Sequence, residues 1–456
     1  MKKSENMVWR FFASVRLALF SLLILATTSV IGTLIQQKKP PEFYIDTFGP
    51  RTAQLFQLLD ITDMYSSWWF IGLLLLFAVN LIVCTINRLP NVWQLVVMNN
   101  LDTDPTRLEK MPHRQVFHSR EDVSVLTQTA ATLLAKNGWK VQSENKPAGS
   151  LLFSQKRAWS RLGVYAVHLS ILIIFAGAII GSLFGFKASV MIPEGSATDI
   201  VYETSTGNPI PLGFTVQCDD FQVTYYPIGG TPKEFRSDLT VRDNAAQKTF
   251  TRRIIVNDPL DYKGITFYQA SYQPLQGFKI NITNKATNAQ QSFQVPVAEK
   301  INWPDTGIEF GIINQEIRSQ MGDAGKIKIW FSDGEGEPST FWMKNDATET
   351  ILRPSATYEF QASQIYATGL QVAKDPGVWT VYIGCTLMLI GLYVAFFLSH
   401  RKIWVYISRE EAADRSRIIV CGNSSKNKIA FEKEFASLIT RFEENPSFTS
   451  SKEQQA

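Results

Sequence analysis

Four long apolar stretches divide the chain. They occupy residues 17–35, 68–86, 162–186 and 378–398, and none of them contains an acidic or a basic side chain other than a histidine. Each is about 20 residues long or longer, the length that an α-helix needs to cross a hydrocarbon core of roughly 30 Å. The pattern therefore predicts four transmembrane helices.

Two other structures also produce apolar windows. A buried helix of a soluble protein is usually about half as long as the run 17–35. A cleavable signal peptide would fit the basic residues before this run, but the run is too long, and residues 32–36 (Gly-Thr-Leu-Ile-Gln) form a poor cleavage site. We therefore expect an uncleaved first helix.

The segment 187–377 alternates apolar and polar residues with a period of two. Runs such as Thr249–Val256, Ile265–Tyr272 and Lys326–Phe331 are separated by Gly, Pro, Asn and Asp. This alternation is typical of strands, and many short strands in sequence predict an antiparallel sandwich or barrel. The segment contains no histidine, which excludes a Ser-His-Asp or Cys-His catalytic site there.

The segments 87–161 and 399–456 show a mixed pattern. The first contains a strand-like start, a helical pattern over about 122–137 with Gly138 as its stop, and two further strand-like runs. The second contains two strand-like pieces and an amphipathic helical pattern near 429–442. We expect the two segments to assemble into one small α+β domain.

Composition alone would suggest a soluble protein. The chain has 456 residues, of which 45% are hydrophobic and 19% charged, and its mean hydropathy is −0.03. The concentrated apolar windows nevertheless exclude a cytosolic globular enzyme, a disordered tail and a fibrous protein. The four cysteines form no CxxC or CxxCH, so a disulfide framework, a zinc module, a thioredoxin-type motif and covalent haem attachment are not expected. A net charge of +4 gives no sign of nucleic-acid binding.

Basic residues predict the orientation, because cytoplasmic flanks retain Lys and Arg. Eleven basic residues lie in 87–161 and four precede the first window, whereas the loop 36–67 has three. We therefore predict that both termini lie in the cytoplasm and that the protein spans a bacterial cytoplasmic (inner) membrane. The cytoplasmic parts are 1–16, the α+β segment 87–161 and the tail 399–456; the extracytoplasmic (periplasmic) parts are the loop 36–67 and the large antiparallel β domain 187–377.

His168 is the one histidine inside a predicted span, where ionisable or metal-binding side chains are costly and often functional. It lies roughly 9 Å inside the cytoplasmic edge of its helix. Three roles fit it: a hydrogen bond to a neighbouring helix, for example to Asn80; a proton relay, which no Asp or Glu in the spans continues; or axial ligation of haem iron. Arg161 lies seven residues earlier on the same helical face, where it can hold a haem propionate.

The same predicted helix carries a stripe of small residues. Gly177, Gly181 and Gly185 recur at intervals of four. Small residues at this spacing allow two membrane helices to approach closely. The stripe is compatible with packing against a partner subunit.

The chain resembles the ResB-like family of cytochrome c biogenesis proteins, the system II route. The resemblance covers nearly the whole chain in the right order, and the Asp375-Pro376-Gly377 motif is fairly specific. It is carried by Ser14–Leu19, Trp68–Phe70, Asn80–Thr85, Arg88, His168, Asp258–Leu260, Tyr262–Tyr272, Thr368–Gly377 and His400–Trp404.

This resemblance implies a subunit that takes haem b from the cytoplasmic side and delivers it for covalent attachment to apocytochrome c. It implies an integral membrane haem-handling partner of the CcsA/ResC type, a thioredoxin-like thiol reductase and membrane lipid as further partners. His168 matches a transmembrane histidine proposed to ligate haem iron. The chain lacks a complete active site, so it would at most form part of a holocytochrome c synthase (haem lyase) complex, and the β domain would hold the partner or present the apocytochrome.

Two other functions remain open. A b-type membrane cytochrome would need paired histidines within the spans, and this chain has only His168. A membrane scaffold or sensor with an outer β domain has no use for His168. Replacement of that residue therefore separates the scaffold from the haem-handling subunit.

Overall fold

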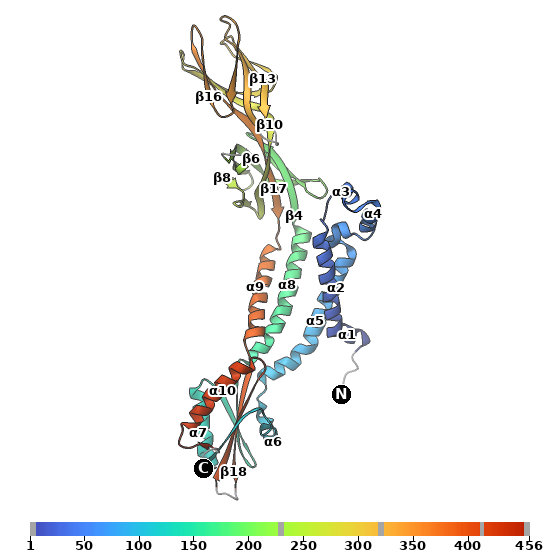
Figure 1. Ribbon diagram of the computed structural model, residues 1–456, viewed down its shortest axis with the longest axis vertical. Helices are drawn as coiled ribbons and strands as arrows, with labels where there is room; N and C mark the ends of the chain where they lie inside the picture. Colours follow the sequence, from blue (N-terminus) through green and yellow to red (C-terminus); the bar gives the residue numbers. More distant parts are fainter. Residues whose placement is uncertain (1–5, 227–231, 318–322, 411–414, 451–456) are drawn as a thin grey trace. The chain divides into compact units, whose positions relative to one another are not determined.

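The computed structural model describes residues 6–226, 232–317, 323–410 and 415–450. The chain forms two compact units (Figure 1). One consists of residues 1–176 with 380–456, and the other of residues 177–379. The α+β domain and most of the helical part belong to the first unit. The second unit contains the β domain with the last residues of α8 and the first of α9.

Within the described residues, four helices are long and apolar enough to cross a membrane, which confirms the four predicted apolar helices. They are α2 (Val15–Leu34), α5 (Trp68–Val97), α8 (Gly163–Phe184), which follows the 3₁₀ turn η3 (Ala158–Leu162), and α9 (Val378–Phe397). The side of the membrane on which each connecting segment lies stays a prediction.

Helix α5 is longer than expected. The apolar window ends at Ile86, but the helix continues through Arg88 and Pro90 to Val97. A charged residue ends an apolar window without ending a helix, because backbone hydrogen bonding continues beyond it. Proline lacks the N–H that would bond to the preceding turn, and α5 bends toward its C-terminal end in Figure 1.

The connection between α2 and α5 is also helical. Its core is the packing of Leu25, Met64 and Phe70, and the Ser67 hydroxyl accepts a hydrogen bond from the Phe70 N–H at 3.3 Å at the start of α5. The short elements at this end of the chain are α1 (Met7–Phe12), α3 (Pro41–Phe48), α4 (Pro50–Leu58) and the 3₁₀ turn η1 (Ile61–Ser66).

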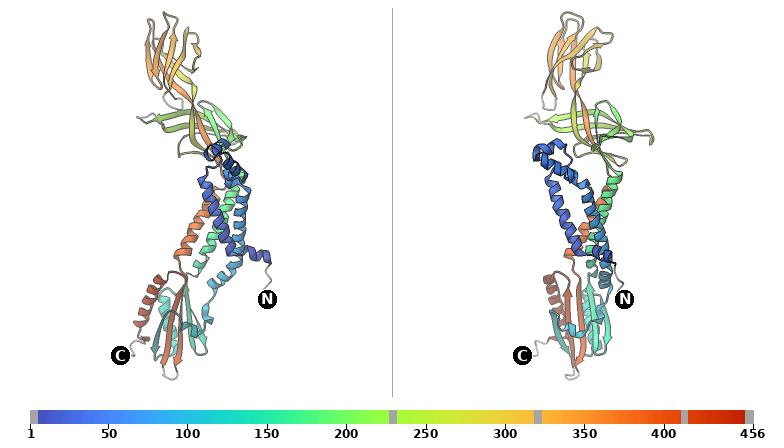
Figure 2. Two further views of the ribbon diagram at one scale, coloured as in Figure 1. Left: turned by 45° about the vertical axis from the view of Figure 1, so that its right-hand side comes forward. Right: turned by 90° about the vertical axis from the view of Figure 1, so that its right-hand side faces the viewer.

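Helices α8 and α9 lie side by side (Figure 2), and glycines set their separation. A Cβ on Gly377 would lie 2.0 Å from the Gly177 carbonyl oxygen, and one on Gly181 would lie 2.6 Å from an Asp375 carboxylate oxygen. The small-residue stripe is therefore covered by the chain's own Asp375–Gly377 turn. This turn explains the motif, because Asp375 also accepts the Gly377 N–H at 2.9 Å before α9 begins.

Segments that precede and follow the β domain in the sequence share one six-stranded sheet, so the middle segment and the tail form one α+β domain. The strand order is β2-β3-β18-β19-β1-β20, with β18 joining the middle segment to the tail. Helices α7 (Val123–Lys136) and α10 (Lys428–Glu443) pack on one face. The 3₁₀ turn η2 (Asn100–Asp102) and α6 (Pro105–Leu108) pack on the other. The strands are β1 (His113–Ser119), β2 (Val141–Lys146), β3 (Gly149–Lys156), β18 (Arg401–Glu410), β19 (Arg415–Ser424) and β20 (Thr449–Ser450).

The β domain has two lobes that share the long antiparallel strands β10 (Ile265–Asn284) and β17 (Thr357–Lys374). The first lobe (186–274 with 366–374) buries one apolar core, and the second lobe (277–364) buries another between two sheets. The other strands are β4 (Phe186–Pro193), β5 (Ala197–Glu203), β6 (Pro209–Tyr225), β7 (Pro232–Asp243), β8 (Lys248–Ile255), β9 (Leu260–Tyr262), β11 (Ala289–Pro296), β12 (Lys300–Trp303), β13 (Ile308–Ile317), β14 (Ala324–Ser332), β15 (Ser339–Lys344) and β16 (Thr348–Leu352).

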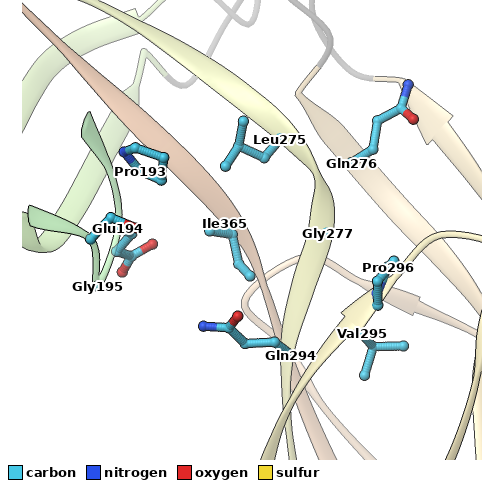
Figure 3. A pocket seen from close by; sticks show the side chains of 11 residues that line it. Pro193, Glu194, Gly195, Leu275, Gln276, Gly277, Gln294, Val295, Pro296 and Ile365 are labelled. Carbon is cyan, nitrogen blue, oxygen red and sulfur yellow. The ribbon is translucent and has the colours of Figure 1, made fainter. Parts of the chain in front are cut away.

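The lobes meet at an irregularity in the ladder between β10 and β17. Pro274 pairs with Tyr366 and Phe278 pairs with Gln364, so three residues of β10 stand opposite Ile365 alone. Figure 3 shows Leu275 and Gly277 beside Ile365 at this crossing. A surface cavity of about 340 Å³ lies there. The strands of both lobes pair antiparallel, which confirms the predicted antiparallel β structure.

Candidate functional site

The start of α8 carries three of the side chains in this region. Val164 and Tyr165 lie four and three residues before His168, a spacing that puts them on one face of the helix. Arg161 lies in the 3₁₀ turn η3, directly before α8. His168 lies in the second turn of α8 and is half-buried.

The His168 ring is held by α5 and by its own helix. Its Nδ1 lies 2.9 Å from the Thr85 hydroxyl oxygen, and its ring packs edge-on against Tyr165 with ring centres 5.9 Å apart. Within the described part of the chain, Nε2 has no hydrogen-bond partner. A histidine that binds a metal typically uses one nitrogen for the metal and bonds through the other. The geometry therefore suits a ligand.

Asn80 has a different role from the one considered above. Its side-chain amide donates to the Phe12 carbonyl at 2.7 Å and to the Ser14 carbonyl at 3.1 Å. It therefore bonds the chain between α1 and α2 to α5. His168 does form a hydrogen bond to a neighbouring helix, one of the three roles considered for it, but its partner is Thr85, more than one turn further along α5, and not Asn80.

Arg161 donates to a second histidine. Its Nε–H points to Nδ1 of His400 at 2.8 Å. A guanidinium only donates, so His400 Nδ1 must carry a lone pair and Nε2 the proton, which is donated to the Gln155 side-chain oxygen at 2.9 Å. Burial, with the charges of Lys402 and Arg161, lowers the pKa of His400 to about 4. His400 is therefore a neutral side chain with both nitrogens engaged.

A cavity of about 310 Å³ lies beside the same face of α8. We call it the α8 cavity. It combines two cationic side chains with three hydroxyl groups and three apolar side chains. Its lining residues are Val92, Ser160, Arg161, Val164, Tyr165, Leu398, Ser425 and Lys426. Such a mixture suits an amphipathic molecule that carries acidic groups.

A second cavity, the β-domain cavity, has the opposite charge. It measures about 520 Å³ and is lined by Glu194, Asp220, Asp323 and Asp346 among others. The Tyr272 hydroxyl donates to Asp323 at 3.0 Å. Burial, and the Asp220 carboxylate with which Glu194 shares a hydrogen bond, raise the pKa of Glu194 to about 7. The Arg236 guanidinium lies 3.6 Å from Asp220, and the Asn345 amide donates to Asp346 at 3.2 Å, so each of these carboxyl groups has a partner within the β domain.

The cysteines outside the spans are poor nucleophiles. Cys218 and Cys421 are fully buried, and burial raises the pKa of each thiol to about 12. At neutral pH both remain protonated, and the protonated thiol is unreactive. The described residues thus hold Cys218 as a structural side chain of the first lobe.

Sequence reasoning missed Thr85, His400 and Lys426 as parts of this region. His400 carried one usable signal, because it is one of only four histidines and directly follows the last apolar window. Thr85 and Lys426 carried none, since a threonine in a span and a lysine in a tail are common. Their importance comes from contacts with residues that are remote in the sequence.

Comparison with known proteins supplies a family. A family model described as the ResB-like family matches residues 15–361 and 337–436, well over half of the chain. Among similar proteins, one named cytochrome c biogenesis protein CcsB from Microcystis aeruginosa is 29% identical over 446 residues, covering 94% of each chain. Another with that name from a Nostoc species is 27% identical and covers 93% of this chain and 90% of its own. A protein named cytochrome c biogenesis protein Ccs1 from Rhodomonas salina is 27% identical, covering 94% and 95%.

Proposed function

The chain belongs to the ResB-like family, and from this premise we propose that it is a membrane subunit of system II cytochrome c biogenesis. In this role it takes haem from the cytoplasmic side and, with a CcsA/ResC-type partner, delivers it for covalent attachment to apocytochrome c. Proteins named cytochrome c biogenesis protein CcsB are similar to this chain over nearly its whole length, and this similarity supports the general role.

One observation carries the haem-handling part of the proposal. His168 has one ring nitrogen fixed by Thr85 and the other without a partner among the described residues. Haem would supply an iron with an open axial position, and a neutral imidazole nitrogen is a common ligand for it. Arg161 in the turn before α8, with the α8 cavity beside it, offers a guanidinium to a propionate.

A second ligand and the covalent step belong to other proteins in this proposal. Ligation by two histidines would need the partner, because this chain has no other histidine in its apolar helices. The thioether chemistry needs reduced cysteines of the apocytochrome, which a thioredoxin-like reductase would maintain. The β domain would hold the partner or present the apocytochrome.

The test is His168→Ala, co-expressed with the partner and purified as the membrane complex. We expect the visible absorption of bound haem to be lost and c-type cytochromes to disappear from the cells, with partial recovery on addition of imidazole. The matched control is His118→Ala, a histidine of strand β1 in the α+β domain, which should retain both. Normal haem content and normal cytochromes in His168→Ala would refute the ligand role and favour the scaffold or sensor.

A further inference from the structure

The α8 cavity holds an excess of positive charge. Arg161 and Lys426 line it, and neither forms an ion pair within the described part of the chain. Lys402 lies near enough for the Arg161 charge, together with burial, to lower the pKa of its ammonium group. The carboxylate of Glu434 on α10 is paired with Arg401 and Lys156. Cations gathered without acidic partners are unfavourable unless an anion binds between them.

One nitrogen of the Arg161 guanidinium is held by a hydrogen bond, and the other two remain available for a ligand. Its Nε is occupied by His400, and His400 is fixed in turn by Gln155, whose amide donates to the Val96 carbonyl at 3.3 Å. Its two terminal amino groups have no hydrogen-bond partner among the described residues. That free fork is the part of arginine that binds a carboxylate through two parallel hydrogen bonds.

Lys426 is oriented from the other end of the chain. Its ammonium group donates to the Ala395 carbonyl in the last turn of α9. An ammonium group has three N–H donors, so two stay available to a second acidic group. Val92, Val164 and Leu398 supply the apolar part of the same lining. The cavity therefore combines two cationic groups with an apolar surface.

We propose that the α8 cavity binds a flat apolar molecule through its two carboxylates, one held by Arg161 and the other by Lys426, with His400 as the positioning residue for Arg161. This inference rests on the proposed function, in which that molecule is haem and the two carboxylates are its propionates. It assigns a binding role to the segment between β19 and α10, which begins more than 240 residues after the end of α8 in the sequence.

The test compares haemin with haemin dimethyl ester, in which both carboxylates are blocked. Each is titrated into the purified complex with its partner, and binding is followed by visible absorption. We expect the wild-type protein to prefer haemin, and Lys426→Gln and Arg161→Gln each to reduce that preference about tenfold, the effect of one lost charge-assisted hydrogen bond. An unchanged preference in Lys426→Gln would overturn the proposal.

Two substitutions at His400 separate positioning from folding. Asn places its side-chain oxygen where Nδ1 stood and can still accept the Arg161 N–H, whereas Gln places its polar group at the Nε2 position and cannot. We expect His400→Gln to lose the preference for haemin as Arg161→Gln does, and His400→Asn to keep it, at similar unfolding temperatures. Equal preferences in the two variants would show that His400 does not position Arg161.

The same titrations distinguish this inference from the proposed function. His168→Ala should weaken haemin and the dimethyl ester alike, because an axial ligand does not sense the carboxylates. If His168→Ala weakens both while Lys426→Gln changes nothing, the proposed function stands and the carboxylate site fails. If Lys426→Gln reduces the preference for haemin while His168→Ala leaves the binding of both compounds unchanged, the carboxylate site stands and the ligand role of His168 fails.

Discussion

The α8 cavity and the β-domain cavity have opposite charges, and they satisfy those charges in different ways. In the β-domain cavity, the Glu194 carboxyl keeps its proton to about pH 7 next to Asp220, and Tyr272 donates to Asp323. In the α8 cavity, among the described residues, Arg161 donates a hydrogen bond to a neutral histidine and Lys426 to a backbone carbonyl, and neither forms an ion pair.

The difference shows which cavity is the better candidate for a ligand. Carboxyl groups can relieve crowding by holding a proton, because their pKa rises into the physiological range when they are buried together. A guanidinium has no such option, since it stays protonated in proteins. This difference is the reason why we propose an external anion for the cationic cavity and none for the acidic one.

The largest effect should come from Thr85→Val. This substitution removes the hydrogen bond that orients the His168 ring, whose Nε2 has no partner among the described residues. We expect haem affinity of the complex to fall about 10–100-fold, the usual cost of losing the partner of a metal-binding histidine. Visible absorption titrations measure it. Thr85→Ser keeps the hydroxyl and should bind as the wild type does; equal affinities for Val and Ser would show that this hydrogen bond does not prepare the site.

A smaller effect should follow acidification at His400. Its pKa is about 4 in the folded protein and about 6.5 when unfolded, so the unfolded state binds more protons between these values. The stability that neutral His400 contributes is present above pH 6.5 and is lost as the pH falls toward 4. We expect the unfolding temperature of the wild type to drop more between pH 7 and pH 4.5 than that of His400→Asn, which has no titrating ring. Parallel pH profiles would contradict the assigned neutral state.

The smallest effect should come from Glu194→Gln in the β-domain cavity. The folded pKa of about 7 lies above the ordinary value near 4.5, so the contribution of this carboxyl is fully present below pH 4.5 and is lost as the pH rises through 7. In the wild type, protection of the backbone amides near the β4–β5 turn against hydrogen exchange should therefore be lower at pH 8 than at pH 5. In the variant, this loss of protection should be smaller. The exposed Glu234→Gln is the control; if it behaves like Glu194→Gln, the effect is one of net charge.

The apolar helices were predictable because lipid exposure demands long uncharged runs, a property of the local sequence. The same criterion failed at the end of α5, where Arg88 ended the window while the backbone stayed helical. Alternation predicted strands, but the division into lobes depends on the pairing of β10 with β17, and register over such a separation has no local signal.

For the candidate site too, local sequence predicted some residues, whereas others depend on contacts between distant segments. His168 was found because an ionisable residue is rare in a span, and Arg161 because seven residues make two turns of one helix. The hydrogen bond to Thr85 joins residues 83 positions apart, and that between Arg161 and His400 joins residues 239 apart. Such contacts arise only from tertiary packing.

The sharing of β10 and β17 makes the second lobe an insertion at the tip of a hairpin. Its core residues lie between 278 and 362, and on the first-lobe side Pro274 and Tyr366 already face each other as antiparallel partners. A two-residue turn can join strands at such a pair. The second lobe is accordingly one contiguous stretch of the gene, inserted between two strand segments that already pair with each other in the first lobe.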